Sequence, residues 1–406
     1  MIVLSHATGN EFVRQALLAF DEAAILQEFW TTISWNSNSA LDRMLPRPFR
    51  QMLARRSFPQ SIRSRTHTLP ARETMRLLGG ALGTSSRHET GFFSIDEVFR
   101  KLDARVARRL QRISNCQAVY AYEDGALETF RAASDLGVHR IYDLPIGYWR
   151  AGQRIFDEEK ARQPEWSSTL TGALDSSEKL ARKDEELRLA DRVIVASTFT
   201  RKTLAEAPTD APIDVVPYGS PEPISDEIKK SNGSLKVLFA GSLGQRKGLA
   251  YLLEAVSQLQ GAVQLTLLGR KAANGCKPLD SAVKEHRWIP TLDHKGVLRE
   301  MQSHDVLVLP SLFEGFGLVI LEAMAQGTPA IVTDHTAGPD VIENMVDGFV
   351  IPIRSSDAIV ERLDLLLTDR NRLMAMKSAA KRKAQELKWE SYRRCLVKVA
   401  REVMAS

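Results

Sequence analysis

The most telling stretch of this 406-residue chain reads Glu314-Gly315-Phe316-Gly317-Leu318-Val319-Ile320-Leu321-Glu322. It follows the apolar segment 306–309, which we expect to form a strand, and it opens a helix that we expect over 318–326. The first carboxylate then lies in a strand-to-helix loop, and the second lies roughly 7 Å further along the helix axis. This pattern favours an α/β domain that binds a ligand at the carboxyl ends of its strands.

The start of this helix suits a phosphate, because its free N–H groups and the positive end of its dipole attract anions. The amides near Gly317 and Leu318 can face a diphosphate, while one carboxylate reaches a sugar hydroxyl and the other a ribose diol. The loop therefore predicts a nucleotide-sugar site. The simpler interpretation is a helix start with two solvated glutamates.

Segments on both sides of the loop support the first interpretation. Leu309-Pro310-Ser311 leads in, Ala325-Gln326-Gly327-Thr328-Pro329 leads out, and Val346-Asp347-Gly348-Phe349-Val350 follows. Together with the loop they resemble the C-terminal domain of the retaining glycosyltransferases of family 4, also called glycosyl transferases group 1, which have the GT-B fold. The resemblance implies that Glu314 contacts the donor sugar and Glu322 the nucleotide ribose. The rest of the donor loop is then Gly315, Phe316, Gly317 and Leu318.

The composition is that of a soluble globular protein, with 44% hydrophobic and 26% charged residues. No apolar run approaches the roughly 20 residues of a membrane span, and the first residues become polar too soon for a signal peptide. Cys116, Cys276 and Cys395 are widely spaced, so we expect buried free thiols in a reducing cytoplasm.

The positive charge is concentrated in one part of the chain. The net charge is +5, yet residues Arg43 to Arg112 hold sixteen Lys and Arg against five Asp and Glu. This segment predicts contact with an anionic membrane or a pyrophosphate-linked lipid acceptor; the alternative is a solvated surface with internal ion pairs. We do not expect a nucleic-acid partner, because no recognition motif or aromatic platform accompanies the charge.

Short apolar runs alternate with amphipathic helices along the chain, which indicates α/β units around parallel sheets. We expect strands at 2–5, 118–122, 140–144, 193–196 and 213–216, and then at 236–240, 264–268, 306–309 and 330–333. A segment rich in Pro, Gly and Ser separates the two sets. We therefore predict two Rossmann-like domains facing a cleft, 1–217 and 235–387, with a linker over 218–234. The resemblance implies that the first is the acceptor-side domain and the second the donor-binding domain. By resemblance, the last helix, 388–406, packs back on the first domain.

A second loop of the C-terminal half carries basic residues. Gly241-Ser242-Leu243-Gly244-Gln245-Arg246-Lys247-Gly248 follows the strand 236–240 and is not a P-loop, because it lacks the Gly-Lys-Ser/Thr ending. It looks like the family segment that binds the donor diphosphate, and Lys247 matches the family lysine. Ser242 stands where the family commonly has arginine, so we expect Arg246 to supply that charge. Gly241 and Ser242 are then donor-binding.

The first loop of the chain is a further candidate. Thr8 and Glu11 fit a capping box before an amphipathic helix, and Gly9 lets the backbone approach a ligand. The family has a glycine-bearing loop over the donor phosphates here, so we expect donor contacts at Gly9 and Asn10. A plain capped helix explains the same residues.

Two other positions take their roles from the resemblance. Asp143 stands where many relatives have a histidine near the acceptor, and the backbone at Ile289 stands where the family meets the nucleotide base. The implied reaction retains the anomeric configuration, with a diphosphate oxygen accepting the proton. It needs no cofactor and no metal beyond the nucleotide-diphospho-sugar substrate.

The sequence thus predicts a cytoplasmic hexosyltransferase that acts on a glycan or lipid-linked acceptor in polysaccharide or lipopolysaccharide biosynthesis. The inner face of the membrane is the place we expect for a lipid-linked acceptor. A GT-B nucleotide-sugar epimerase and a catalytically impaired nucleotide-sugar-binding protein are the alternatives. The departures at Ser242 and Asp143 keep the second alternative open.

Overall fold

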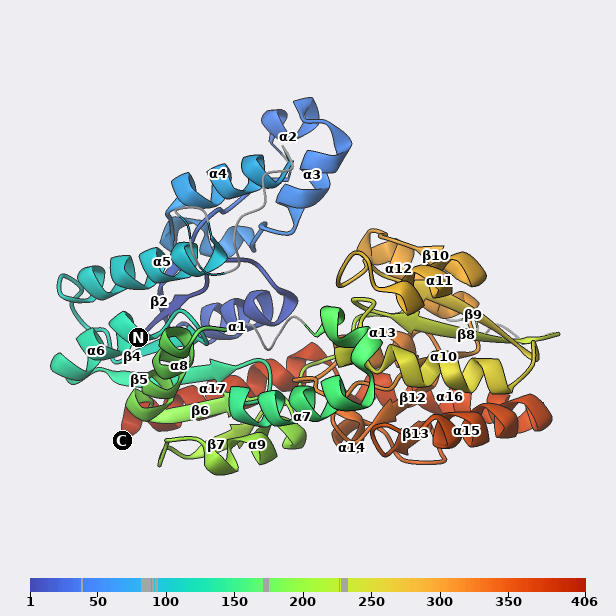
Figure 1. Ribbon diagram of the computed structural model, residues 1–406. Coiled ribbons are helices and arrows are strands. Elements are labelled where there is room, and N and C mark those ends of the chain that lie inside the picture. Colours follow the sequence, from blue (N-terminus) through green and yellow to red (C-terminus); the bar gives the residue numbers. More distant parts are fainter. Residues whose placement is uncertain are drawn as a thin grey trace.

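The chain forms two parallel β-sheets that lie side by side, each flanked by helices (Figure 1). The computed structural model describes residues 1–37, 39–81, 89, 91, 94–170, 175–225, 227 and 233–406. Among these residues no helix has the length and apolarity needed to cross a membrane.

The N-terminal sheet has seven strands in the order β3-β2-β1-β4-β5-β6-β7, and every neighbouring pair is parallel. Chain order reverses between β1 and β4, as in a Rossmann fold, and the crevice at such a point is where ligands bind. The strands are β1 (Ile2–Ser5), β2 (Leu26–Thr31), β3 (Thr66–Thr68), β4 (Ala118–Tyr122), β5 (His139–Leu144), β6 (Arg192–Val195) and β7 (Ile213–Val215).

The two faces of this sheet bury different helices, because successive strand residues point to opposite sides. Ile2 and Leu4 belong to the core with α1 and α17, whereas Val3 belongs to the core with α5 and α6. The helices of this half are α1 (Glu11–Glu22), α2 (Ala40–Met44), α3 (Arg47–Ala54), α4 (Pro70–Ala81), α5 (Ile95–Leu110), α6 (Leu127–Asp135), α7 (Trp149–Arg162), α8 (Ser177–Leu189) and α9 (Thr198–Thr203), with 3-10 turns η1 (Gln60–Arg65), η2 (Pro164–Thr169) and η4 (Leu204–Glu206).

The C-terminal sheet repeats the same topology with six parallel strands in the order β10-β9-β8-β11-β12-β13. Its reversal lies between β8 and β11. The strands are β8 (Leu235–Ala240), β9 (Val263–Leu268), β10 (Arg287–Ile289), β11 (Val306–Leu309), β12 (Ala330–Thr333) and β13 (Gly348–Ile351). The helices are α10 (Leu249–Gln258), α11 (Lys277–Glu285), α12 (His294–Ser303), α13 (Leu318–Ala325), α14 (Gly338–Val341), α15 (Ser356–Thr368), α16 (Arg370–Glu386) and α17 (Trp389–Ala405), with the 3-10 turn η5 (Gln245–Lys247).

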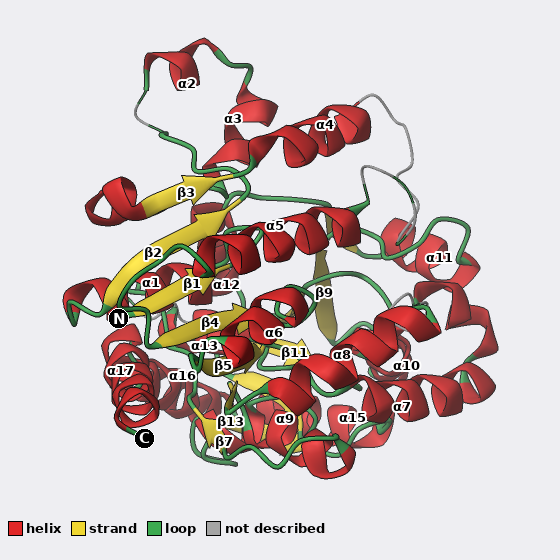
Figure 2. Cartoon of the chain, turned by 90° about the vertical axis from the view of Figure 1, so that its left-hand side faces the viewer, coloured by secondary structure: helices red, strands yellow, loops and turns green. Residues whose placement is uncertain are grey.

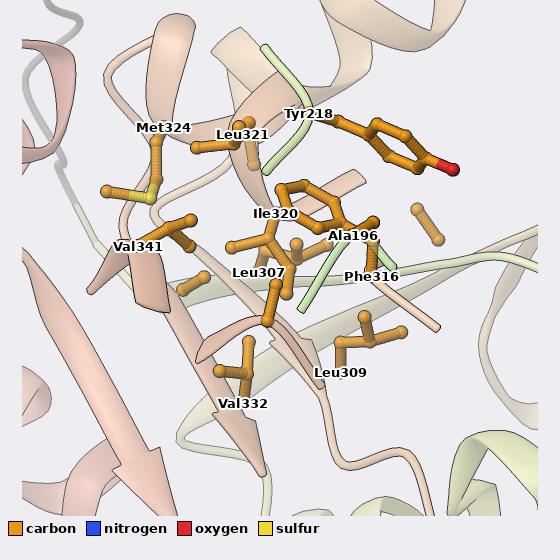
Figure 3. Close-up of a cluster of buried hydrophobic side chains, with 14 of the residues drawn as sticks. Ala196, Tyr218, Leu307, Leu309, Phe316, Ile320, Leu321, Met324, Val332 and Val341 are labelled. Carbon is orange, nitrogen blue, oxygen red and sulfur yellow. The ribbon is translucent and has the colours of Figure 1, made fainter. Parts of the chain in front are cut away.

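Helix α13 is held against its sheet by a cluster of buried apolar side chains. Ile320 and Leu321 of the helix belong to one buried apolar cluster with Leu307 and Val332 of the two adjacent strands (Figure 3). All four side chains are fully buried. Each contributes roughly 1.5–3 kcal/mol by leaving water, so this packing fixes the height at which the helix begins over the sheet.

The last helix, α17, returns to the N-terminal half, as the resemblance implied. It packs against α1 and β5 (Figure 1), and the amino group of Met1 lies 3.7 Å from Met404 Sδ. Figure 2 shows the two ends of the chain close together on this side. The return crossing runs beside the outgoing one: Ser220 N donates to Leu387 O at 2.7 Å, and Ser220 Oγ to Ala384 O at 2.6 Å.

All nine expected strands are present, with ends shifted by at most one residue. Four further strands, β2, β3, β10 and β13, were not expected; β2 contains Gln27 and Glu28, which break its apolar pattern. The expected capping box is wrong, because α1 begins at Glu11 and its N-cap is Asn10 rather than Thr8. The expected burial of all three free thiols is wrong for Cys395, which is exposed. The domain boundaries stay a prediction, and residues 226 and 228–232 of the expected linker lie outside the described part of the chain.

Candidate functional site

Two loops of the C-terminal sheet meet at its topological reversal. One follows β8 and the other follows β11, and these strands are neighbours, so their carboxyl ends lie together. The loops are joined directly, since Leu312 N donates to Arg246 O at 2.9 Å. Gly248 makes this approach feasible: a Cβ there would stand 1.9 Å from Pro310 O, and its φ of +69° suits glycine.

The predicted catalytic residues Arg246, Lys247 and Glu314 form one ion-paired cluster. Lys247 Nζ pairs with Glu314 Oε2, and Arg246 Nη1 lies 3.2 Å from the same oxygen. Arg246 Nη1 also donates to Phe313 O at 3.0 Å. The sequence predicted the two basic residues and the carboxylate as separate contributors to a donor site, and the fold brings them into contact.

Both members of the main pair are largely removed from water, which shifts their proton equilibria. Burial lowers the pKa of Lys247, and Glu314 only partly offsets that effect. Burial alone would raise the pKa of Glu314, but Lys247 and Arg246 outweigh it, so the pKa of this carboxyl is lowered. Glu314 is therefore an anion at neutral pH, held beside two cations.

Helix α13 starts directly above this cluster. Its N-cap is Gly317 at φ +84°, and Ile320 N donates to Gly317 O at 2.9 Å. The N–H groups that precede Ile320 in the first turn have no acceptor within the helix, so they can meet an anion. Leu318 is half-buried in this first turn, whereas Phe316 is buried against Tyr218, with ring centroids 5.1 Å apart. Phe316 is thus a packing residue of the loop.

Glu322 lies on the exposed side of α13, one turn beyond its start, and contacts a residue that the sequence did not assign. His294 Nε2 lies 3.1 Å from Glu322 Oε1, and this hydrogen bond raises the pKa of the imidazole. Glu11 and Arg14 of α1 also influence His294 electrostatically, so the start of α1 faces it from the other half of the molecule.

The remaining donor-side candidates lie around the same edge of the sheet. Gly241 directly follows β8, and a Cβ at this glycine would stand 3.5 Å from Lys247 Cε. Ser242 is exposed beside it. Ile289 ends β10, and its carbonyl already accepts the Gly269 N–H at 2.9 Å. A ligand contact at Ile289 would therefore have to use another group of its backbone or the second lone pair of that oxygen.

The first loop of the chain packs on an N-terminal segment rather than standing open. A Cβ at Gly9 would lie 2.7 Å from Arg55 O and 3.2 Å from Phe58. This approach requires a glycine whether or not a ligand binds. Asn10 is exposed, and its side chain makes no capping hydrogen bond to α1. Its amide is thus available to a ligand.

Asp143 does not join the cluster around Glu314. Its side chain is 2% exposed and accepts a hydrogen bond from Tyr120, on the sheet face that packs against α17. Burial raises the pKa of Asp143 to about 7. The structure therefore gives Asp143 a role within the core of the N-terminal half, and its expected place near the acceptor has no support in these contacts.

Residues of the N-terminal half hold the Glu314 loop from the opposite side. Ser197 Oγ donates to Gly315 O at 2.5 Å, and Thr200 Oγ1 donates to the same oxygen at 3.0 Å. A Cβ at Gly315 would stand 1.9 Å from Pro145 O. No sequence signal indicated that the Ser197 hydroxyl reaches the other domain.

The two halves are also joined by a buried carboxylate, Glu159, and by a cluster of aromatic rings. Glu159 of α7 is fully buried and accepts hydrogen bonds from Gln245 Nε2 at 2.6 Å, Tyr251 OH at 2.9 Å and Arg354 Nε at 2.9 Å. Phe313 packs edge-on against Phe156 and Phe199, with centroid distances of 5.7 and 5.6 Å.

In the described residues no group of three or more His, Cys, Asp or Glu is arranged to hold a metal ion.

Comparison with known proteins agrees with this geometry. Residues 220–383 match the family model described as Glycosyl transferases group 1. A phosphatidyl-myo-inositol mannosyltransferase of Mycobacterium leprae is 34% identical over 137 residues, which is 32% of this chain and 37% of the relative. A D-inositol 3-phosphate glycosyltransferase of Jonesia denitrificans is 29% identical over 168 residues, 38% of this chain and 40% of that protein. The chain thus spans well under half the length of these two relatives.

Solved structures match over nearly the whole chain. Sucrose-phosphate synthase from Thermosynechococcus elongatus superposes with a TM-score of 0.68 at 18% identity, covering 100% of this chain and 99% of that one. HepE from Anabaena, in complex with UDP and glucose, gives 0.63 at 15% identity, covering 98% of both. At these identities the likeness concerns the fold.

Two Rossmann-like sheets side by side and these superpositions define a GT-B glycosyltransferase fold. Within it, residues 220–383 match the model of the glycosyl transferases group 1 family.

Proposed function

We propose that this chain is a retaining glycosyltransferase that moves a sugar from a nucleotide-diphospho-sugar to a glycan or lipid-linked acceptor. The observation that carries the proposal is the contact of Lys247 and Arg246 with Glu314 directly below the start of α13. Cations and free amides at one point suit a diphosphate, and a carboxylate beside them suits the hydroxyls of the attached sugar.

The residues of the cluster act on the charge that develops during transfer. As the glycosyl bond breaks, negative charge grows on the departing diphosphate, and fixed cations and amides stabilise it more in the transition state than in the ground state. Glu314 holds Lys247 and Arg246 in place before the donor arrives, so little reorganisation is needed. Glu322 stands further along α13, where it can accept hydrogen bonds from a ribose diol.

Retention requires that the acceptor hydroxyl approach the face from which the diphosphate leaves. A diphosphate oxygen then accepts the hydroxyl proton, and no additional protein base, cofactor or metal is needed in the proposed reaction. The two cations beside Glu314 serve the step in which the diphosphate departs, because they stabilise the negative charge that grows on it.

We also propose that the enzyme works at the cytoplasmic face of a membrane. Helices α2, α3 and α4 of the basic part of the chain form the outer end of the N-terminal half (Figure 1). Several of its arginines are engaged in ion pairs, such as Arg56 and Arg76 with Glu73 and Arg65 with Asp21. Arg43, Arg55 and Arg63 are exposed, and so are Met44, Met75 and Leu78. Exposed cations together with exposed apolar side chains suit an anionic lipid surface. Residues 82–88, 90 and 92–93 of the segment lie outside the described part of the chain.

A thermal-shift screen against UDP, GDP, ADP and their sugar conjugates tests the donor site. A ligand at about 100 times its dissociation constant adds roughly 2.7 kcal/mol to stability. We expect one nucleotide series to shift the wild type and Glu361→Ala, an exposed carboxylate on α15, but not Glu322→Ala. Equal shifts in all three proteins, or none in the wild type, would contradict the proposal.

Vesicle sedimentation tests the membrane contact separately. We expect binding to phosphatidylserine vesicles that weakens with salt and with Met44→Ser/Leu78→Ser, and little binding to neutral phosphatidylcholine. Equal binding to both vesicle types would contradict the electrostatic part of this proposal.

A further inference from the structure

A cavity lies next to the Glu314 cluster, on the side of the N-terminal half. It has a volume of about 280 Å³, and both halves of the molecule line it. Arg246 links the two sites, because its guanidinium lines this cavity and also contacts Glu314 Oε2 at 3.2 Å. The side chains that matter for its chemistry are Glu123, Trp149, Gln153, Lys183, Arg246 and Phe313.

Glu123 reaches this cavity because of the topology of the N-terminal sheet. It is the first residue after β4, and β4 neighbours β1 at the point where the strand order reverses. The crevice at that point is the binding position of a Rossmann-like domain. Each domain therefore presents one carboxylate, Glu123 or Glu314, from its own reversal point.

The Glu123 carboxylate is the least satisfied member of a buried charged group. In the described residues its one ion-pair partner is Lys183, at 3.5 Å, whereas Lys183 lies closer to Asp175, at 3.0 Å. The side chain of Glu123 is only 11% exposed. A carboxylate that is nearly buried and weakly paired can accept further hydrogen bonds from a ligand.

The charges of the lining favour a neutral ligand over an anionic one. In the described lining two carboxylates, Glu123 and Asp175, share one cation, Lys183, and the other cation, Arg246, is assigned to the proposed diphosphate. A phosphate in this cavity would therefore meet an excess of carboxylate charge. A hydroxyl can donate to the carboxylates and accept from Lys183 or Arg246, so a polyhydroxylated ring fits both kinds of group.

The apolar part of the lining and the size agree with this. Trp149 and Phe313 line the cavity, and the indole is held by its Nε1 bond to Asp184 at 2.7 Å. A fixed aromatic ring offers a flat surface to the C–H face of a sugar. A volume of about 280 Å³ is near the lower end of small-molecule pockets, which suits one monosaccharide unit.

We propose that this cavity is the acceptor subsite, that it takes a neutral, polyhydroxylated sugar ring, and that Glu123 positions that ring by accepting hydrogen bonds from its hydroxyls. The term acceptor rests on the proposed function, but binding of the sugar ring does not. The proposal excludes a phosphorylated group from this cavity and leaves any lipid phosphate to other surfaces.

Saturation-transfer NMR on the full chain tests the inference with methyl α-D-glucopyranoside, methyl α-D-mannopyranoside and glucose 6-phosphate as probes at millimolar concentration. We expect ring-proton signals from at least one methyl glycoside in the wild type, with a fivefold or larger loss in Glu123→Ala and in Gln153→Ala. Lys183 keeps its pair with Asp175 in Glu123→Ala, and Gln153 is exposed, so both variants should fold. The control is Glu185→Gln, another carboxylate of the same half, which pairs with Arg188.

Three results would overturn the proposal: no saturation of either methyl glycoside, unchanged signals in both variants, or displacement of the glycosides by glucose 6-phosphate. The nucleotide thermal shift is measured on the same proteins. If the glycosides behave as expected and no nucleotide binds, the proposed transfer reaction fails while the sugar site stands. If nucleotides bind and the glycosides do not, the reverse holds.

Discussion

Ser197 Oγ in the N-terminal half donates a 2.5 Å hydrogen bond to the carbonyl oxygen of Gly315 in the C-terminal half, one residue from Glu314. Both residues are buried. The opposite domain therefore hydrogen-bonds the loop that carries Glu314, and the position of this loop depends on how closely the two halves approach. We infer that closing the cleft and aligning Glu314 are coupled.

Substitution Gly315→Ala should separate the halves at this point. The new Cβ would stand 1.9 Å from Pro145 O and 2.8 Å from Ile146 Cα, both backbone atoms that cannot move freely. We expect a loss of about 1–3 kcal/mol in unfolding free energy and faster amide exchange over residues 313–317. Ser197→Ala should have a smaller effect in the same direction. The control is Ser378→Ala, which loses only a hydrogen bond to Met374 O within α16. If Gly315→Ala and the control show the same exchange rate over residues 313–317, the opposite domain does not hold the loop.

Substitution Lys247→Ala should reduce transfer far more than it reduces stability. Lys247 is 8% exposed and paired with Glu314, so its loss removes a cation from the diphosphate position and leaves the carboxylate to Arg246. We expect a 10²–10³-fold fall in kcat, comparable to the loss of one oxyanion donor. Arg246→Ala should lower kcat by about tenfold. The control is Lys202→Ala on the surface of α9, which should leave kcat unchanged. Nucleotide release in the presence of donor and acceptor measures all three, and a Lys247→Ala enzyme with normal kcat would contradict the assignment.

Donor binding should depend on the protonation of His294. Its imidazole lies 3.1 Å from Glu322 Oε1, and the pKa of His294 is raised, so below that pKa the imidazolium competes with a ribose for Glu322. We expect the nucleotide Kd of the wild type to fall as pH rises from 6 to 8, because deprotonation releases the carboxylate. His294→Ala should show a tighter Kd at pH 6 and a flatter profile. Calorimetric titration at the two pH values decides the point, and parallel profiles would contradict it.

Asp143 should lower stability at neutral pH. Burial raises its pKa to about 7 from an ordinary value of 3.8, so the folded state keeps the proton while the unfolded state loses it. Between about pH 4 and 7 the unfolded state binds fewer protons, and the stability contribution of Asp143 falls as pH rises, by up to about 4 kcal/mol. We expect Asp143→Asn to be more stable than the wild type at pH 8 and nearly equal to it at pH 4. Urea unfolding at both values checks this; a difference independent of pH would show that Asp143 does not titrate as described.

Much of the fold follows from local pattern. Most of the nine expected strands centre on a short apolar run, such as 306–309, as parallel sheets covered on both faces require. Among the missed strands, β2 departs from this pattern at Glu28, which is buried because Trp30 Nε1 and Arg109 bond its carboxylate. Such a partner, 81 residues away, cannot be read from a local pattern.

The site was predictable to the same extent. Lys247 and Glu314 follow neighbouring strands, so their proximity derives from the topology. Asp143 illustrates the limit, since the alternation of β5 already places it on the face of Ile141, but only the return of α17 shows that this face is closed. His294, Ser197 and Glu123 were not assigned, because each acquires its role from a contact with a distant segment.

The return of α17 constrains how the enzyme can open. The chain crosses between the halves once at Ser220 and once at Lys388, and the two crossings lie against each other: a Cβ at Gly219 would stand 2.2 Å from Trp389 N. Two chain crossings that lie against each other act as one hinge. Rotation of one half about this hinge would widen the cleft most at its far side, whereas sliding one half past the other would break the contacts of both crossings. We therefore expect that substrate entry and product release use the same hinge rotation.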